Sequence, residues 1–177
     1  MKEIISIGVG QAGVNLCTSL WDRQIREHGL LTSTAFDEKE NGNLKPRTVL
    51  VDTDPDMRMI VKRDFPEVAS MIDLDQMITG AEGSGDNYIR GHYTIGREVL
   101  NPSLEAIRRQ VEQCDNLEAL IIHSAIAGGT GSGLMCLLLE RLSGLYQKKA
   151  RINNLLYASN SGNVTNVVEP YNAVLST

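Results

Sequence analysis

A glycine-rich segment, Ser124–Leu134, carries the clearest chemical signal in this sequence. It joins the apolar run Leu117–Ile122, which predicts a buried strand, to the run Leu134–Tyr146, which predicts a helix. Glycines let a backbone approach an anion closely, and the free N–H groups at the start of a helix attract that anion. The layout therefore predicts a phosphate-binding loop. Its candidate contacts are Gly128, Gly129, Thr130 and Gly131.

Two carboxylates, Asp52 and Asp54, follow a second predicted strand at Thr48–Val51. In an extended segment, side chains at i and i+2 point the same way. Such a pair suits Mg²⁺ held through its water shell beside a triphosphate. Asp54 taken alone also fits an acidic turn that caps the next helix, and that alternative stays open.

The glycine segment lacks the Gly-x-x-x-x-Gly-Lys-Ser/Thr pattern, so an ordinary P-loop ATPase or GTPase is disfavoured. A dinucleotide-dependent oxidoreductase is also a poor interpretation, because we expect the glycine spacing at the first strand to differ from Gly-x-Gly-x-x-Gly and because no ribose-reading acid follows the second strand in the usual context. The chemistry of the loop therefore favours another class of phosphate-binding protein.

The elements that must position these residues alternate between strands and helices. Further strands are predicted at Ile4–Val9 and Ile152–Ala158, helices at Val14–His28, Met57–Arg63 and Glu169–Leu175, and loops at Leu31–Lys45 and Gly80–Asp86. Phe65–Met77 fits no single element. Between Tyr88 and Cys114, Asn101-Pro102 interrupts a helical pattern and predicts a kink or a break.

This alternation predicts an α/β fold, with a doubly wound, mostly parallel open sheet and helices on both faces. In such a sheet ligands bind beyond the carboxyl ends of the strands. We therefore expect the loops that follow the strands to converge on one crevice. The last strand, Ile152–Ala158, is expected to leave an edge and an apolar face exposed.

Several stretches resemble the tubulin superfamily in their order and spacing. They are Ile4–Gly13, Pro46–Pro55, Ile78–Glu98, Gly128–Gly133 and Val167–Leu175. Gly10–Val14, Gly91–Gly96 and Leu139–Ser143 look more like the alpha subunit than the beta subunit. The sequence is identified as a divergent, alpha-like member of that superfamily. The resemblance implies a Rossmann-like GTP-binding domain over residues 1–177, truncated and incomplete at its C-terminal side. The family's guanine-reading helix, hydrolysis-activating loop, second domain and acidic tail would then lie beyond it.

The resemblance also implies GTP or GDP with Mg²⁺ as ligands. The residues it places against the nucleotide are Gly10, Gln11, Ala12, Asn15, Ser84, Gly85, Asp86, Gly128, Gly129, Thr130, Gly131, Thr165 and Glu169, with Asp52 and Asp54 at the metal. Asn15 replaces the family's usual glutamine and keeps the amide on a shorter arm. Gly10 and Gly13 also fit a plain tight turn, and Glu169 before Pro170 also fits a helix start. No catalytic residue is assigned.

Some positions depart from the family pattern. Asp86 replaces an asparagine that donates to phosphate, and Gly83 replaces an alpha-subunit aspartate. A carboxylate beside a γ-phosphate is unfavourable unless it binds Mg²⁺ or is protonated. Asp86 therefore takes over a metal role, which we favour, or weakens triphosphate binding. Ala125 replaces a phosphate-contacting serine, for which the Ser124 hydroxyl is a weak substitute. His123 is expected to be a core residue.

The composition excludes several classes of partner. A net charge of −5 without a basic stripe disfavours nucleic acid. No apolar run approaches the roughly 20 residues of a membrane span, and the N-terminal run stops too early for a signal peptide. The 3 cysteines form no Cys-x-x-Cys pair, which fits a reducing compartment. We expect a protein of the cytoplasm.

Two functions remain open at this stage. The resemblance implies a GTP-binding subunit of the microtubule cytoskeleton, or a fragment of one, whose partners are other tubulin subunits. The alternative is an interaction module that keeps the fold, binds nucleotide poorly and modulates tubulin assembly, as the changes at Gly83, Asp86 and Ala125 suggest. Whether the chain hydrolyses GTP stays uncertain.

Overall fold

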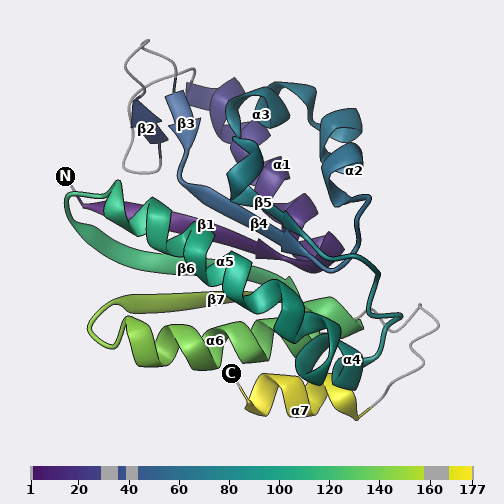
Figure 1. Ribbon diagram of the computed structural model, residues 1–177. Helices are drawn as coiled ribbons and strands as arrows, with labels where there is room; N and C mark the ends of the chain where they lie inside the picture. Colours follow the sequence, from purple (N-terminus) through teal and green to yellow (C-terminus); the bar gives the residue numbers. More distant parts are fainter. Residues whose placement is uncertain (1, 29–35, 39–43, 158–167, 177) are drawn as a thin grey trace.

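A fully parallel five-stranded sheet forms the centre of the computed structural model, which describes residues 2–28, 36–38, 44–157 and 168–176 (Figure 1). Its strands are β1 (Glu3–Val9), β4 (Thr48–Asp52), β5 (Met77–Thr79), β6 (Leu117–Ala125) and β7 (Ala150–Leu156). Their spatial order is β5-β4-β1-β6-β7. Counted along the chain within this sheet, the order is 3-2-1-4-5, which is the order of Rossmann-type folds. The predicted doubly wound α/β sheet is confirmed.

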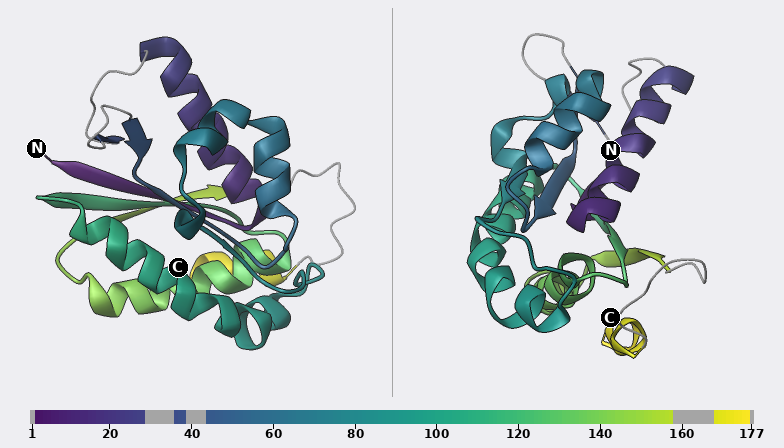
Figure 2. Two further views of the ribbon diagram at one scale, coloured as in Figure 1. Left: turned by 45° about the horizontal axis from the view of Figure 1, so that its top comes forward. Right: turned by 90° about the vertical axis from the view of Figure 1, so that its right-hand side faces the viewer.

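Helices cover both faces of the sheet (Figure 2). One face carries α1 (Gly10–His28), α2 (Met57–Asp64) and α3 (Pro66–Met71), and the other carries α5 (Ile95–Glu112) and α6 (Met135–Leu145). Along β4 the side chains alternate between the two cores. Leu50 packs with α1 and α2, while Val49 and Val51 pack with α5 and α6. Burial on both faces explains why the strands are almost continuously apolar.

The break near Asn101-Pro102 was predicted wrongly. The helix α5 continues through Pro102, and the chain instead breaks at Thr94, after the short helix α4 (Tyr88–Tyr93). Pro102 removes the N–H that would pair with the Glu98 carbonyl, but both residues lie on the exposed side of α5, where water can hydrate that carbonyl. Packing of the opposite, apolar side of α5 against the sheet keeps the helix intact.

The predicted surface loop at Leu31–Lys45 is also partly wrong. Within the described residues it contains β2 (Phe36–Glu38) and β3 (Leu44–Pro46), which pair antiparallel. Phe36 is buried and meets Trp21 of α1 edge to face, with ring centroids 5.0 Å apart. This aromatic contact, which the polar composition of the segment concealed, extends the core on the α1 side.

A buried ion pair joins this small sheet to the main one. The Arg47 guanidinium donates from Nη2 to Glu3 Oε1 at 2.9 Å and to Asp37 Oδ1 at 3.1 Å. Arg47 and Glu3 are both buried. The cluster lies at the amino ends of the strands, away from the loops that were expected to bind a ligand.

Smaller differences concern element boundaries. The first helix begins at Gly10 rather than at Val14, and β6 continues to Ala125. Between β6 and α6 a π-helical turn, η2 (Thr130–Leu134), precedes the regular helix. The ambiguous stretch Phe65–Met77 resolves into α3, a 3₁₀ turn η1 (Leu74–Gln76) and the start of β5. The helix α7 (Glu169–Leu175) was predicted correctly.

Strand β7 is an edge of the sheet within the described residues, and its outward face carries apolar side chains. Ile152 is 47% exposed, Leu156 is 38% exposed and Tyr157, just after the strand, is 64% exposed. The expected exposed edge and apolar face are therefore confirmed for residues 150–157.

Among the described helices, none combines the length and apolar character needed to cross a bilayer.

Candidate functional site

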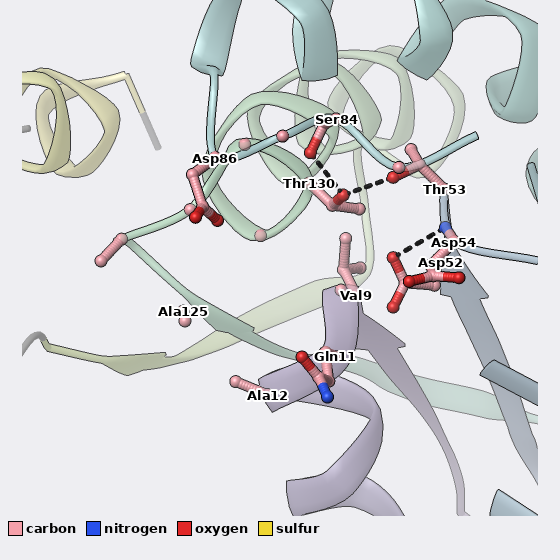
Figure 3. A pocket seen from close by; sticks show the side chains of 17 residues that line it. Val9, Gln11, Ala12, Asp52, Thr53, Asp54, Ser84, Asp86, Ala125 and Thr130 are labelled. Carbon is pink, nitrogen blue, oxygen red and sulfur yellow. Dashed lines mark hydrogen bonds between the residues drawn. The ribbon is translucent and has the colours of Figure 1, made fainter. Parts of the chain in front are cut away.

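A pocket of about 250 Å³ opens at the carboxyl ends of the strands, where loops that follow four of them meet (Figure 3). It lies beside the junction of β1 and β6, where the strand order reverses, which is the ligand site of doubly wound sheets. Its lining residues are Val9, Gly10, Gln11, Ala12, Asp52, Thr53, Asp54, Gly83, Ser84, Gly85, Asp86, Ala125, Ala127, Gly128, Gly129, Thr130 and Gly131. The expected convergence of the loops on one crevice is therefore observed.

The loop after β1 turns tightly into α1. Gly10 has a φ of +72°, and a Cβ there would come within 3.0 Å of the Gly131 backbone nitrogen. Gly13 lies directly against the His123 carbonyl, so α1 sits close to β6. Gly8, Gly10 and Gly13 have the Gly-x-Gly-x-x-Gly spacing of nucleotide-binding turns, so the expectation that the first strand lacks this spacing was wrong. The tight-turn and ligand-site interpretations of Gly10 are compatible here.

Glycines of the loop after β6 permit close packing as well as close approach to an anion. Gly128 has a φ of +102°, which favours glycine. A Cβ on Gly129 would come within 2.5 Å of Ser84 Oγ, and one on Gly131 within 2.5 Å of the Ala125 carbonyl oxygen. The loop after β6 can therefore pack against the loop after β5 only because Gly129 lacks a side chain, and Gly131 lets it turn back closely on the end of β6.

Two carboxylates line the β4 side of the pocket. Asp52 ends β4 and is 4% exposed, and burial raises its pKa to about 6 from an ordinary value of 3.8. Asp54 lies beyond the end of the strand, in a bend, so the extended geometry expected for the pair was wrong, although both residues line the pocket. The Asp54 Oδ1 atom accepts the Asp56 N–H at 2.9 Å, which gives Asp54 a role in the turn before α2 as well.

A third carboxylate, that of Asp86, lies across the pocket from Asp52 and Asp54 (Figure 3). Asp86 has a φ of +53°, in the left-handed region, and follows Gly85 with a φ of +60°. Next to it, the Asn87 side chain caps α4 by accepting from the Ile89 and Arg90 N–H groups. The cap and the left-handed turn fix the position of Asp86 at the pocket rim.

The charges around the pocket are all of one sign. Its lining, as the described residues form it, contains three aspartates and no lysine, arginine or histidine. Groups of three or more His, Cys, Asp or Glu arranged to hold a metal ion do not occur in the described part of the chain. Asp52 and Asp54 alone would supply only part of a ligand set, and such a pair would suit a cation that keeps most of its water shell.

The remaining predicted site residues lie elsewhere. Asn15 lines a small adjoining cavity of about 10 Å³ together with Gln11, Asp52 and Asp54. Glu169 begins α7 and does not line the main pocket. Thr165 falls outside the described residues.

The two residues that precede Ala125, His123 and Ser124, do not line the pocket. Ser124 is completely buried, its hydroxyl has no hydrogen-bond partner, and Ala125 rather than Ser124 lines the site. His123 is buried, pairs its Nδ1 with Asn154 Nδ2 at 3.3 Å, and has its pKa lowered by burial. The interpretation of His123 as a core residue is therefore supported.

Five lining residues were not among the predicted site residues: Val9, Thr53, Gly83, Ala125 and Ala127. Gly83 and Ala125 had been named only as departures from the family pattern. Thr53 lies between the two aspartates, and its place directly after a strand was an available signal. Val9 and Ala127 carry no chemical signal of their own, because only their position at a loop brings them to the pocket.

The strand order and the pocket at its reversal point define a Rossmann-like α/β domain. The Tubulin/FtsZ family, GTPase domain, matches residues 3–177, and the chain belongs to that family. It is 39% identical to the tubulin alpha-1 chain of Saccharomyces cerevisiae, 38% to that of Arabidopsis thaliana and 35% to the tubulin alpha chain of Encephalitozoon cuniculi. Each comparison covers 100% of this chain but only 42–43% of the relative.

Proposed function

We propose that this chain binds GTP or GDP together with Mg²⁺, as a tubulin-like subunit or part of one. The observation that carries the proposal is the pocket itself, at the reversal point of the sheet, with the glycine-rich loop on one side and the carboxylates of buried Asp52 and exposed Asp54 on the other. A cavity of about 250 Å³ is slightly smaller than the usual range of ligand pockets, ~300–1,000 Å³. It suits the phosphate end of a nucleotide.

The phosphates would lie between the start of α1 and the start of η2. Backbone N–H groups around Gly10, Gln11 and Ala12 form one side, and those of Gly128 to Gly131 form the other. Helix starts favour anions because their N–H groups lack intrahelical partners and the helix dipole is positive there. This arrangement supplies attraction without a lysine.

The three aspartates make a cation necessary. A triphosphate entering a pocket with Asp52, Asp54 and Asp86, in which the described part of the chain supplies no basic lining residue, would be repelled unless a cation accompanied it. A buried carboxylate such as Asp52, whose ionised form is disfavoured by burial, is stabilised by a nearby cation. Asp52 and Asp54 would hold Mg²⁺ through water molecules, and the ion would neutralise the phosphate charge.

We further propose a role in the microtubule cytoskeleton of the cytoplasm, with other tubulin subunits as partners. The family match and the similarity to tubulin alpha chains support this role.

We assign no catalytic residue within the pocket. In phosphoryl transfer the protein contributes positioning and electrostatic stabilisation, so a water-positioning group is needed for rapid hydrolysis.

A second candidate function is a tubulin-fold interaction module that binds nucleotide poorly and modulates assembly. Its support is Asp86, a negatively charged residue at the rim where the terminal phosphate would lie. Repulsion at that point lowers triphosphate affinity if no cation screens it.

Nucleotide content separates the two candidates. The protein would be purified in the presence of magnesium, and nucleotide would be released with acid and identified by chromatography. We expect GTP or GDP in amounts close to one per chain. A nucleotide-free protein that also fails to bind added GTP in excess magnesium would contradict the first proposal and favour the interaction module.

A further inference from the structure

The turn that carries Asp54 is held by hydrogen bonds rather than by a strand. Asp54 Oδ1 accepts the Asp56 N–H at 2.9 Å, and the Asp54 N–H donates to Asp52 Oδ1 at 3.4 Å (Figure 3). Helix α2 begins directly after this turn, at Met57, and the side chain of Asp56 makes no capping hydrogen bond. A helix start without a cap lacks the contact that usually fixes it, so the position of this end of α2 depends on other contacts.

Arg58, in the first turn of α2, supplies such a contact. Its guanidinium donates from Nε and Nη2 to the Met77 carbonyl oxygen of β5, at 3.1 and 2.6 Å. Met57 and Val61 of α2 are also buried in the core. Apolar packing is non-directional, however, whereas paired hydrogen bonds to one atom restrict orientation as well as distance. Arg58 therefore restricts where the start of α2 can lie relative to β5.

The Met77 carbonyl is available to Arg58 because it lies on the free side of β5. Gly80 donates its N–H to the Asp52 carbonyl at 2.9 Å, so Gly80 faces β4. Backbone groups of successive residues in a strand point alternately to its two sides, so Met77, three positions earlier, faces away from β4. Within the described residues β4 is the only strand paired with β5. Arg58 thus binds an edge carbonyl that would otherwise meet water.

These contacts close a ring around the two carboxylates of the proposed cation site. In the ladder of β4 and β5, Asp52 pairs with Thr79. Thr79 lies two residues after Met77, the residue that Arg58 binds. Arg58 in turn lies in the helix whose first turn is bonded to Asp54. The separation of Asp52 and Asp54 is therefore set both by the chain between them and by the path through α2 and β5.

We propose that Arg58 is a positioning residue for the proposed cation site, which sets the spacing of the Asp52 and Asp54 carboxylates by tethering α2 to β5. This inference rests on the proposed function, because it requires a cation at these carboxylates. Arg58 lines neither the pocket nor the small adjoining cavity, so it acts through the position of Asp54 rather than by touching a ligand. Loss of a residue that orients a metal ligand typically lowers metal affinity about 10–100-fold.

The test separates the position of Asp54 from the charge of Arg58. GTP affinity is measured in excess magnesium and in excess chelator, and the ratio of the two affinities is the readout. Arg58→Met removes both tether and charge, whereas Arg58→Lys keeps the charge and loses the paired donors. The matched control is Arg151→Met, since Arg151 also donates to a backbone carbonyl, that of Tyr146 at 2.9 Å, but near the amino end of β7 and away from the pocket.

We expect Arg58→Met to reduce the ratio about tenfold, the lower end of the effect of losing a residue that orients a metal ligand. Loss of the charge alone has the opposite sign, because removing a positive charge favours the cation and disfavours phosphate without a cation, which raises the ratio. Arg58→Lys should give a ratio between those of Arg58→Met and the wild type, and Arg151→Met should leave the ratio unchanged. In an Asp54→Asn background, Arg58→Met should have little further effect, because the carboxylate that Arg58 positions is gone.

The outcomes distinguish this inference from the proposed function. Circular dichroism verifies folding, and if Arg58→Met does not fold, Arg58→Lys takes its place in both backgrounds. GTP binding by the wild type with an unchanged or raised ratio in the folded variant would overturn the inference and leave the proposed function intact. An equal reduction in Arg151→Met, or an undiminished effect in the Asp54→Asn background, would also overturn it. Failure of the wild type to bind GTP under any condition would overturn both.

Discussion

The carboxylate of Asp52 should destabilise the ligand-free fold at neutral pH, so replacing it with asparagine should make the protein more stable. Burial raises the Asp52 pKa from 3.8 to about 6, which is a shift of about two units. Each unit corresponds to about 1.4 kcal/mol of difference between the two protonation states. Ionisation of Asp52 therefore lowers the free energy of unfolding by roughly 3 kcal/mol, and Asp52→Asn should recover much of this stability.

The effect has a definite pH dependence. Because the folded-state pKa lies above the unfolded one, the folded protein binds the proton more tightly, and stability falls as pH rises between 3.8 and about 6. Below this window Asp52 is neutral in both states, and above it the full penalty applies. The free energy of unfolding of Asp52→Asn minus that of the wild type should therefore increase through this window and then level off.

Urea unfolding in the presence of a chelator, followed by circular dichroism from below pH 4 to pH 8, measures this difference. The control is Asp115→Asn, an exposed position that precedes the amino end of β6, far from the pocket. This variant should not show the increase in the stability difference with pH. Magnesium should stabilise the wild type more than Asp52→Asn. A variant that is no more stable than the wild type at neutral pH, or a difference that does not vary with pH, would refute the reasoning.

Three further outcomes are expected. Asp86→Asn should lower GTP affinity in magnesium if the carboxylate serves the cation, and a rise at every magnesium concentration in a binding titration would end that idea. Gly131→Val should abolish phosphate binding and also lower the midpoint of thermal unfolding, because a Cβ would come within 2.5 Å of a backbone oxygen. The control is Gly144→Ala, which has open space around it and should raise the free energy of unfolding by about 0.5–1 kcal/mol. Arg47→Met should cost about 3–5 kcal/mol in urea unfolding, because Glu3 is left buried without its partner, and the added change Glu3→Gln should recover part of the loss; an equal loss in both proteins would contradict this explanation.

The binding loops and the order of the elements could be predicted from the sequence because their causes are local. Glycines between an apolar run and a helical run indicate a close turn, and apolar strands alternating with helices indicate a parallel sheet. The convergence of Gln11, Asp52, Ser84 and Thr130 followed from the rule that the loops after parallel strands meet at one edge. These predictions needed no knowledge of side-chain contacts.

Only the tertiary structure decided the features that depend on contacts between distant segments. Pro102 stays inside α5 because the opposite side of that helix packs on the sheet, and Phe36 belongs to the core because it meets Trp21. Neither the packing of α5 on the sheet nor the contact between Phe36 and Trp21 can be predicted from the spacing of residues along the chain.

The same reason explains which features of the pocket could be predicted from the sequence and which could not. The sequence by itself identified a phosphate-type loop, an acidic strand end and, by resemblance, the family. It could not show that Thr130 links Thr53 and Ser84, because those residues are 77 and 46 positions away along the chain. Nor could it show that Asp52 is buried enough to raise its pKa. Hydrogen bonds and desolvation depend on which atoms the fold brings within a few ångströms, and only the folded chain determines that.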